Sequence, residues 1–205
     1  MPLDQTVRDR LDGIVGSDRV VLFMKGTPAM PQCGFSATTT SILSTLVPEY
    51  TTVNVLEDQE IREGIKAYSE WPTIPQLYIG GEFMGGCDIV RQMFNSGELH
   101  DVLDLEPPDR TPPEIHVSDT AANLIRDALS EQPGTAVHLR IDASWQHGFS
   151  LGRVEGHEIA AESNGVTIHM DVGTAPRARG LSVDLEESLT GVTLKVDNPN
   201  VPSNA

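Results

Sequence analysis

The chain has 205 residues, enough for one large domain or two small ones, and its 39% hydrophobic and 21% charged residues predict packed cores rather than global disorder. Acidic residues outnumber basic ones by 30 to 14, a net charge of −16, which argues against binding to the nucleic-acid backbone because phosphate contacts need clustered Lys and Arg. The longest apolar run, Val20–Met24, is too short to cross a membrane.

Cysteine and histidine usage indicates the compartment and the number of modules. The N-terminal residues lack the basic start and apolar stretch of a signal peptide, and the two cysteines, Cys33 and Cys87, do not make a disulfide framework. We therefore expect a cytoplasmic protein whose thiols react or bind metal. Both cysteines lie in the first half, whereas all six histidines lie at or after His100, which indicates two modules.

Residues 106–113 predict a linker between two domains. This segment, Glu-Pro-Pro-Asp-Arg-Thr-Pro-Pro, holds four prolines, which can neither continue a helix nor donate hydrogen bonds to a sheet. We expect one domain at residues 1–105 and a second at residues 114–200, each close to the usual domain size.

Helical and strand-like patterns alternate along the first domain. Apolar spacing and turn residues predict helices at 6–15, 36–46, 59–69 and 88–95, and strands at 20–24, 51–55, 76–79 and 83–84. In the last of these helices we expect Ile89, Val90 and Met93 to be buried. This order favours an α/β fold in which helices flank both faces of one sheet.

The second domain begins with one helix and continues as strands. The patterns predict a helix at 118–130, with Ser118 as its N-cap, and strands at 136–142, 150–154, 166–171, 181–185 and 192–196. Turn residues such as Asn164-Gly165 separate the strands. We expect a small β-rich α+β unit.

The most informative segment is residues 25–36, Lys-Gly-Thr-Pro-Ala-Met-Pro-Gln-Cys-Gly-Phe-Ser, which places Cys33 between a strand and a predicted helix. Backbone N–H groups at a helix start stabilise negative charge, and Lys25 adds a positive charge, so both favour the thiolate. A thiolate is the form needed for nucleophilic attack and for iron ligation. Ser36 stands where a Cys-x-x-Cys motif has its second thiol. Chemistry at Cys33 must therefore recruit a small-molecule thiol or Cys87.

Three motifs of residues 1–105 resemble the monothiol glutaredoxins. They are Cys-Gly-Phe-Ser with the preceding Lys-Gly-x-Pro-x-x-Pro, then Trp71-Pro-Thr-Ile-Pro-Gln76, and then Gly85-Gly-Cys-Asp88. The resemblance implies a thioredoxin-like α/β fold, a mixed sheet flanked by helices, with a cis peptide bond before Pro75 facing Cys33. It also implies a glutathione-binding groove beside Cys33.

The resemblance assigns the groove residue by residue. Lys25 and Arg62 would pair with the glycyl carboxylate of glutathione, backbone groups of Ile74 would bond the tripeptide as an added strand, Cys87 and Asp88 would hold the γ-glutamyl end, and Phe35 would shape the loop. Two interpretations of Cys87 stay open: its side chain only packs while its backbone binds, or it is a resolving thiol.

Two functions follow from the resemblance, and both use Cys33. In the first, a homodimer holds one [2Fe–2S] cluster through Cys33 and a bound glutathione from each chain, and passes it to iron–sulfur acceptor or assembly proteins. In the second, Cys33 is the catalytic thiol of a glutathione-dependent thiol–disulfide oxidoreductase. The long loop Thr27–Gln32 favours the first function, because in the resembling family it goes with weak reductase turnover and with cluster binding.

Residues 114–200 resemble an A-type (HesB-like) iron–sulfur carrier domain, through Ile115-His-Val-Ser-Asp-Thr-Ala-Ala122, Trp145-Gln-His-Gly-Phe149 and the final Asn198-Pro-Asn200. That family binds its cluster through three cysteines, and this domain has none: Gln146 stands at the first position, and no Cys-Gly-Cys tail follows Asn200. We expect a domain kept for docking or dimerisation. The alternative is a metal site built from His147, His157 or His169.

Overall fold

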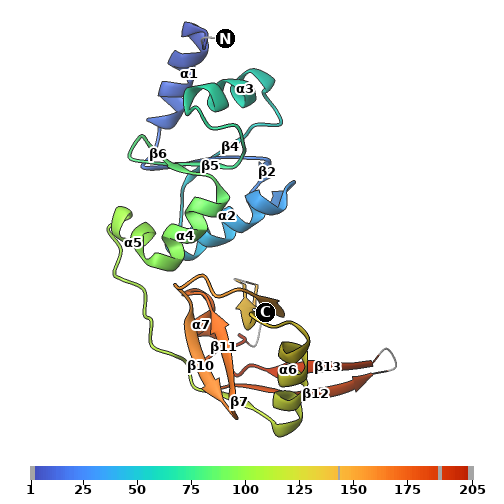
Figure 1. Cartoon of the computed structure of the whole chain (residues 1–205). Coiled ribbons are helices and arrows are strands. Elements are labelled where there is room, and N and C mark those ends of the chain that lie inside the picture. Colours follow the sequence, from blue (N-terminus) through green and yellow to red (C-terminus); the bar gives the residue numbers. More distant parts are fainter. Residues whose placement is uncertain (1–2, 143, 189–190, 203–205) are drawn as a thin grey trace. The chain divides into compact units, whose positions relative to one another are not determined.

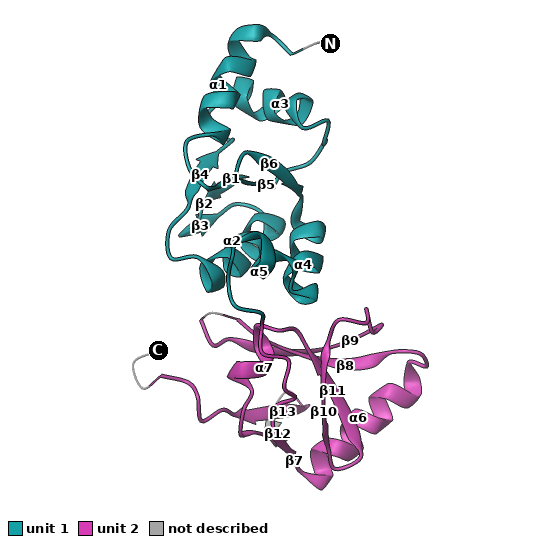
Figure 2. Ribbon diagram, turned by 90° about the vertical axis from the view of Figure 1, so that its left-hand side faces the viewer, with its two compact units in different colours: residues 1–107 teal, residues 108–205 magenta. Residues whose placement is uncertain are grey.

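The computed structural model describes residues 3–142, 144–188 and 191–202, and the chain divides into two compact units, residues 1–107 and 108–205 (Figure 2). Within those ranges, no helix combines the length and apolar character that a membrane span needs. Each unit has its own sheets and its own buried side chains, and is described by itself.

Unit 1 is built on a mixed four-stranded sheet. Its strand order is β4 (Thr51–Asn54), β1 (Val20–Met24), β5 (Gln76–Ile79) and β6 (Glu82–Gly85). Strand β1 runs parallel to β4 and antiparallel to β5, and β5 and β6 form an antiparallel pair. Every residue of β1 is buried, as expected for a central strand covered on both faces.

Helices cover both faces of this sheet (Figure 1). Helices α1 (Gln5–Val15) and α3 (Gln59–Tyr68) lie on one face, and α2 (Gly34–Leu46), α4 (Cys87–Ser96) and the short α5 (Glu98–Val102) lie on the other. Alternate residues of β1, Val21 and Phe23, join the core under α1 and α3 together with Leu11, Ile65 and Tyr78. The predicted helices and strands of unit 1 are therefore confirmed, with ends that differ by at most two residues.

Three short elements of unit 1 were not predicted. The segment expected to be an irregular loop contains a two-residue hairpin, β2 (Gly26–Thr27) with β3 (Met30–Pro31), and α5 follows α4 directly after Gly97, which adopts left-handed φ. Elements this short contain too few residues to show a hydrophobic periodicity, so the sequence pattern does not predict them. Ile89 is half-buried, not buried as predicted, because it faces the cavity described below.

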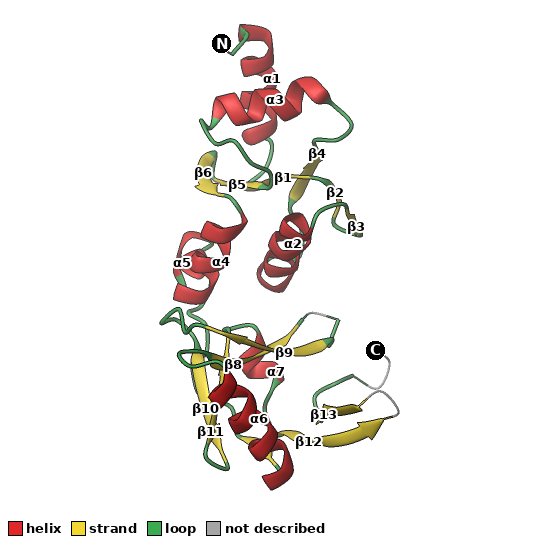
Figure 3. Cartoon of the chain, turned by 45° about the vertical axis from the view of Figure 1, so that its right-hand side comes forward, coloured by secondary structure: helices red, strands yellow, loops and turns green. Residues whose placement is uncertain are grey.

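Unit 2 is β-rich, with two sheets and one long helix (Figure 3). The first sheet has the order β10 (Ile159–Ser163), β11 (Val166–Met170), β8 (Ala136–Ile141) and β9 (His147–Gly152), and the second β13 (Gly191–Asp197), β12 (Leu181–Ser188) and β7 (Ile115–Val117). Helix α6 (Asp119–Glu131) packs against strands of both sheets, and α7 (Thr174–Arg177) packs on β8.

The predicted helix of unit 2 is confirmed, and Ser118 is its N-cap, accepting a 3.2 Å hydrogen bond from the Ala121 amide. Each predicted strand is present, although β9 begins three residues early, at His147. Strands β7 and β10 and the single-turn α7 were missed. Neighbouring segments hold them in place: β7 pairs with β12, and β10 pairs with β11.

Candidate functional site

A tight hairpin places Cys33 at the start of α2. Gly26 adopts φ +84°, and a Cβ atom there would collide with the Met30 carbonyl oxygen, so only glycine fits this turn. The Gln32 amide donates a 2.9 Å hydrogen bond back to the Lys25 carbonyl and closes the hairpin. The loop thereby returns the chain to the end of β1 immediately before Cys33.

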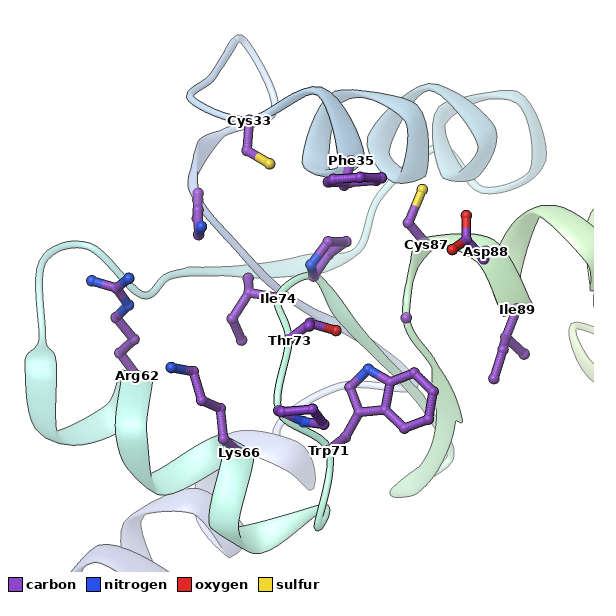
Figure 4. Close-up of a pocket in the computed structure, with 14 residues that line it drawn as sticks. Cys33, Phe35, Arg62, Lys66, Trp71, Thr73, Ile74, Cys87, Asp88 and Ile89 are labelled. Carbon is purple, nitrogen blue, oxygen red and sulfur yellow. The ribbon is translucent and has the colours of Figure 1, made fainter.

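Cys33 is the N-cap residue of α2, with φ −158° and ψ 136°, and its side chain makes no capping hydrogen bond. The thiol is free and half-buried, and it faces the same cavity as Cys87 (Figure 4). The first N–H groups of a helix have no partners within it, so the start of α2 leaves hydrogen-bond donors available next to Cys33.

Ser36 joins the start of α2 to the end of β1. Its fully buried hydroxyl accepts a 3.1 Å hydrogen bond from the Lys25 amide, and its carbonyl accepts one from the Thr40 hydroxyl. The residue that replaces a second thiol therefore holds the backbone of Lys25 against α2. Cys33 has no thiol three residues away with which to form a disulfide.

Hydrogen bonds from the buried Gln76 side chain hold the loop between α3 and β5 in place. Its fully buried amide nitrogen donates to the Trp71 carbonyl at 2.9 Å and the Thr73 carbonyl at 3.2 Å. The Tyr78 hydroxyl donates to the amide oxygen of Gln76 at 3.3 Å, and burial raises the pKa of Tyr78 to about 12, so this donor keeps its proton. The Ile74–Pro75 peptide bond is cis, as the resemblance implied.

Helix α4 begins against this loop because its N-cap is glycine. A Cβ atom on Gly86 would lie 3.0 Å from the indole nitrogen of Trp71 and 3.5 Å from the Pro75 carbonyl oxygen. This close approach sets the first residue of α4, Cys87, beside the loop; its side chain is only 8% exposed. Asp88 follows in the first turn, where a carboxylate is favoured.

These segments enclose a cavity of about 480 Å³. All seven site residues predicted from the sequence line it: Lys25, Cys33, Phe35, Arg62, Ile74, Cys87 and Asp88. They come from the end of β1, the start of α2, α3, the loop before β5 and the start of α4. The fold therefore brings together residues that are far apart in the sequence.

Charge is unevenly distributed around the cavity. Lys25, Arg62 and Lys66 line it, three of the seven basic residues in residues 1–105, and Figure 4 shows Arg62 and Lys66 on the side opposite Asp88. The Lys66 ammonium lies 3.1 Å from the Glu63 carboxylate, but no carboxylate among the described residues lies within 4.0 Å of the Lys25 ammonium. One end of the cavity is cationic, and the other has a helix start with a carboxylate.

Sequence reasoning did not name Lys66, Trp71 or Thr73 as site residues, although all three line the cavity. Lys66 follows Arg62 by four residues on α3, so a helical spacing of basic side chains was the signal that could have found it. These lining residues fit an elongated ligand that has a carboxylate at one end and both a negative and a positive group at the other end.

The histidine site proposed for the second domain is not formed. Among the described residues, no three His, Cys, Asp or Glu side chains come together to hold a metal ion, so the structure does not support the alternative of a metal site built from His147, His157 or His169. His169 on β11 lies instead beside His138 on the neighbouring strand β8, with ring centroids 5.6 Å apart. His147 begins β9, and β8 separates it from β11.

Comparison with known proteins finds relatives for about half of this chain. The family model for glutaredoxins matches residues 20–84. The chain is 51% identical over 102 residues to "Monothiol glutaredoxin-S14, chloroplastic" of Arabidopsis thaliana, and the match covers 50% of this chain and 59% of that protein. A "Monothiol glutaredoxin-5, mitochondrial" of Saccharomyces cerevisiae is 50% identical over 107 residues, with 51% of this chain and 71% of that protein covered.

Two further matches cover nearly the whole of the other protein. The "Uncharacterized monothiol glutaredoxin ycf64-like" of Synechocystis sp. is 48% identical over 103 residues, which are 50% of this chain and 96% of that protein. The solution structure of reduced poplar apo GrxS14 is 51% identical, covers 51% of this chain and 95% of that one, and superposes with a TM-score of 0.45. The chain thus spans less than two thirds of the Arabidopsis protein but almost all of the Synechocystis one.

Proposed function

This chain belongs to the monothiol glutaredoxin family, and on that premise we propose that it binds glutathione in the cavity beside Cys33 and that two chains share a [2Fe–2S] cluster for delivery to other proteins. The mixed sheet of unit 1, with helices on both faces, is the thioredoxin-like fold of this family. The observation that carries the proposal is a cavity lined by the free, half-buried thiol of Cys33, with a cationic end and a helix start at its other end.

Glutathione matches the charges of this cavity end by end. Its glycyl carboxylate would pair with Lys25 and Arg62, and Lys66 adds a third cation there. The backbone of Ile74, in the loop that Gln76 holds, would bond the peptide as an added strand. The γ-glutamyl carboxylate would meet the first N–H groups of α4, and its ammonium would meet Asp88.

The cluster would be cargo held between two chains. A [2Fe–2S] cluster takes four thiolates, whereas this chain has only two cysteines, one of which, Cys87, is buried. Cys33 and one bound glutathione would supply two thiolates per chain, so two chains would complete the set. Because half of the ligands would be exchangeable small molecules, the cluster would be easily released to an acceptor.

Thiol exchange is the second candidate, and the free, half-buried thiol of Cys33, which faces the cavity, favours it. The Cys33 thiolate would attack the glutathionyl sulfur of a mixed disulfide, and the substrate thiolate would leave. A second glutathione thiolate would then attack the same glutathionyl sulfur, forming glutathione disulfide and restoring the Cys33 thiolate. No other oxidant or reductant is consumed: one free glutathione reduces the mixed disulfide, and it leaves as glutathione disulfide together with the glutathionyl group of the substrate.

The deciding experiment is anaerobic reconstitution of the full chain with iron, sulfide and glutathione, followed by visible absorption and sedimentation. We expect a [2Fe–2S] spectrum on a dimer that needs glutathione and is lost in Cys33→Ser. The matched control is Cys87→Ser, which should keep the spectrum. A wild-type chain that forms no cluster but reduces a glutathione mixed disulfide would refute the carrier and favour the second candidate.

The second unit, the partners and the location complete the proposal. Unit 2 would be an A-type-like domain without cysteine ligands, retained for docking or dimerisation, and the recipients would be iron–sulfur acceptor or assembly proteins. A cytoplasmic location rests on the two free thiols, which suit a reducing compartment. The plant and yeast relatives carry chloroplastic and mitochondrial in their names, and fractionation of cells would decide among these locations.

A further inference from the structure

Unit 2 has an apolar cavity of about 220 Å³ that the proposed glutathione chemistry does not use. Helix α6, strands β8 and β9 and strand β13 form its walls. The apolar side chains that line it include Leu124, Ala128, Val137, Phe149, Leu151 and Leu194. Leu124 is 36% exposed, and Phe149, Leu151 and Leu194 are only half-buried, so this surface is left partly open to water.

The open edge of β9 borders this cavity. Phe149, Ser150 and Leu151 are consecutive and all line it, whereas successive side chains of a strand point to opposite faces. Phe149 and Leu151 therefore face the cavity from the same side of the sheet, and Ser150 lies between them. Within the described ranges, β9 pairs with β8 alone, and its other edge keeps its N–H and C=O groups unpaired.

Strand β9 also lacks the features that usually protect an open edge. Its sequence, His-Gly-Phe-Ser-Leu-Gly, contains no Lys, no Pro and no Asp or Glu, whereas natural edge strands commonly carry charges or prolines. Strand β13, on the other side of the cavity, does carry a lysine, Lys195, which lies opposite Asp184 on β12. An unprotected edge beside an apolar cavity is suited to the addition of a strand.

Two acidic side chains of α6 follow the residues that line the cavity. Exposed Asp127 and Glu131 follow Leu124 and Ala128 by three residues each on α6, so they lie on the same side of the helix. The basic residue of that stretch, Arg126, donates instead to the Asn164 carbonyl at 3.0 Å. Residues 106–205 as a whole carry seven basic and fifteen acidic residues.

We propose that this surface binds an extended segment of a partner protein in which every second residue faces α6, with apolar residues in the middle of the segment and Lys or Arg towards its ends. The segment adds to the open edge of β9 and gains main-chain hydrogen bonds there. Its apolar side chains fill the cavity beside Leu124 and Phe149. Its basic side chains on the same face lie against Asp127 and Glu131, and this charge complementarity selects a basic partner over an acidic one.

The test is the fluorescence anisotropy of a labelled peptide, titrated with the full chain at low and high salt; every second residue of the peptide is Val in the middle and Lys towards each end, with Ser between them. We expect saturable binding that weakens with salt, and Leu124→Lys should weaken it about tenfold or more because it places a charge at the apolar contact. The matched control is Val154→Lys. Val154 is 50% exposed and does not line the cavity, so this variant should bind like the wild type.

Two altered peptides test the mode of binding. A peptide with Glu in place of Lys should not bind, and a peptide with N-methyl groups on alternate amides should not bind, because it cannot extend the sheet. Equal binding by either peptide, or unchanged binding by Leu124→Lys, would overturn the proposal. Sedimentation adds one more outcome: a wild-type dimer that Leu124→Lys dissociates would mean that a second copy of the chain covers this surface, and would also overturn it.

Discussion

Replacing Gln76 with Leu should destabilise unit 1 through the loop that carries Ile74 and Pro75. The substitution keeps a buried side chain of similar size but removes the amide that donates to the carbonyls of Trp71 and Thr73. It also removes the acceptor of the Tyr78 hydroxyl. The substitution is chosen to leave the other contacts between the loop and β5 unchanged. Its effect on stability therefore reports the hydrogen bonds of the Gln76 side chain.

The magnitude follows from the number of groups left without partners. A hydrogen bond of this kind contributes about 1 kcal/mol net, and a buried polar group left unpaired costs about 1–3 kcal/mol. Two loop carbonyls and one buried hydroxyl are affected, but the loop is only partly buried, so water satisfies part of the loss. We expect the free energy of unfolding of unit 1 to fall by about 2–3 kcal/mol.

Urea denaturation followed by tryptophan fluorescence measures this change. The chain has two tryptophans, and a Trp145→Phe background removes the one in unit 2. The fluorescence then comes from Trp71 and reports the unfolding of unit 1. The midpoint should fall by about 1–2 M urea with little change in slope. Gln92→Leu, at an exposed position of α4, is the matched control and should change stability by less than about 0.5 kcal/mol. Equal midpoints for the two variants would refute the role given to Gln76.

Three further changes test other parts of the structure. Gly26→Ala forces a side chain into a left-handed turn and against the Met30 carbonyl, so it should lower the thermal midpoint, whereas Gly34→Ala, with open space around its Cβ, should not; equal midpoints would contradict the turn geometry. Burial and the neighbouring His138 lower the pKa of His169 below 6.5, so the unfolded chain binds that proton more tightly. Stability should therefore fall as the pH drops through 6.5, and His169→Asn should flatten this part of the profile measured by denaturation. Burial raises the pKa of Tyr78 to about 12, so an alkaline absorbance titration should show less phenolate in the native chain than in denaturant, and identical titrations would contradict its burial.

Local sequence patterns predicted the long elements of both units. Val20–Met24 is a strand because five consecutive apolar residues suit a strand buried on both faces, and Ser118 caps a helix because its hydroxyl can accept an amide hydrogen bond. The same patterns missed the hairpin at Gly26, whose two-residue strands depend on one left-handed glycine. They also missed β10, which is fixed by pairing with β11.

The residues of the site also fall into two groups: those that sequence motifs predicted and those that only the fold revealed. Motifs alone named the seven lining residues from Lys25 to Asp88, since their resemblance to one family is residue by residue. Lys66 escaped notice because an exposed lysine on a helix is ordinary, and only packing turns that face of α3 toward the cavity. Spacing along the chain does not reveal which strands are neighbours, so only the structure showed that His169 lies beside His138.

By itself the sequence determined where apolar periods begin and end, that Cys33 has Ser36 in place of a second thiol, and that the chain is strongly acidic. Only the tertiary structure decided that α3, the loop held by Gln76 and the start of α4 meet around Cys33. It also decided that β9 has an open edge beside an apolar cavity. The physical reason is that periodicity and capping depend on residues a few positions apart, whereas cavities and sheet edges depend on contacts between distant segments.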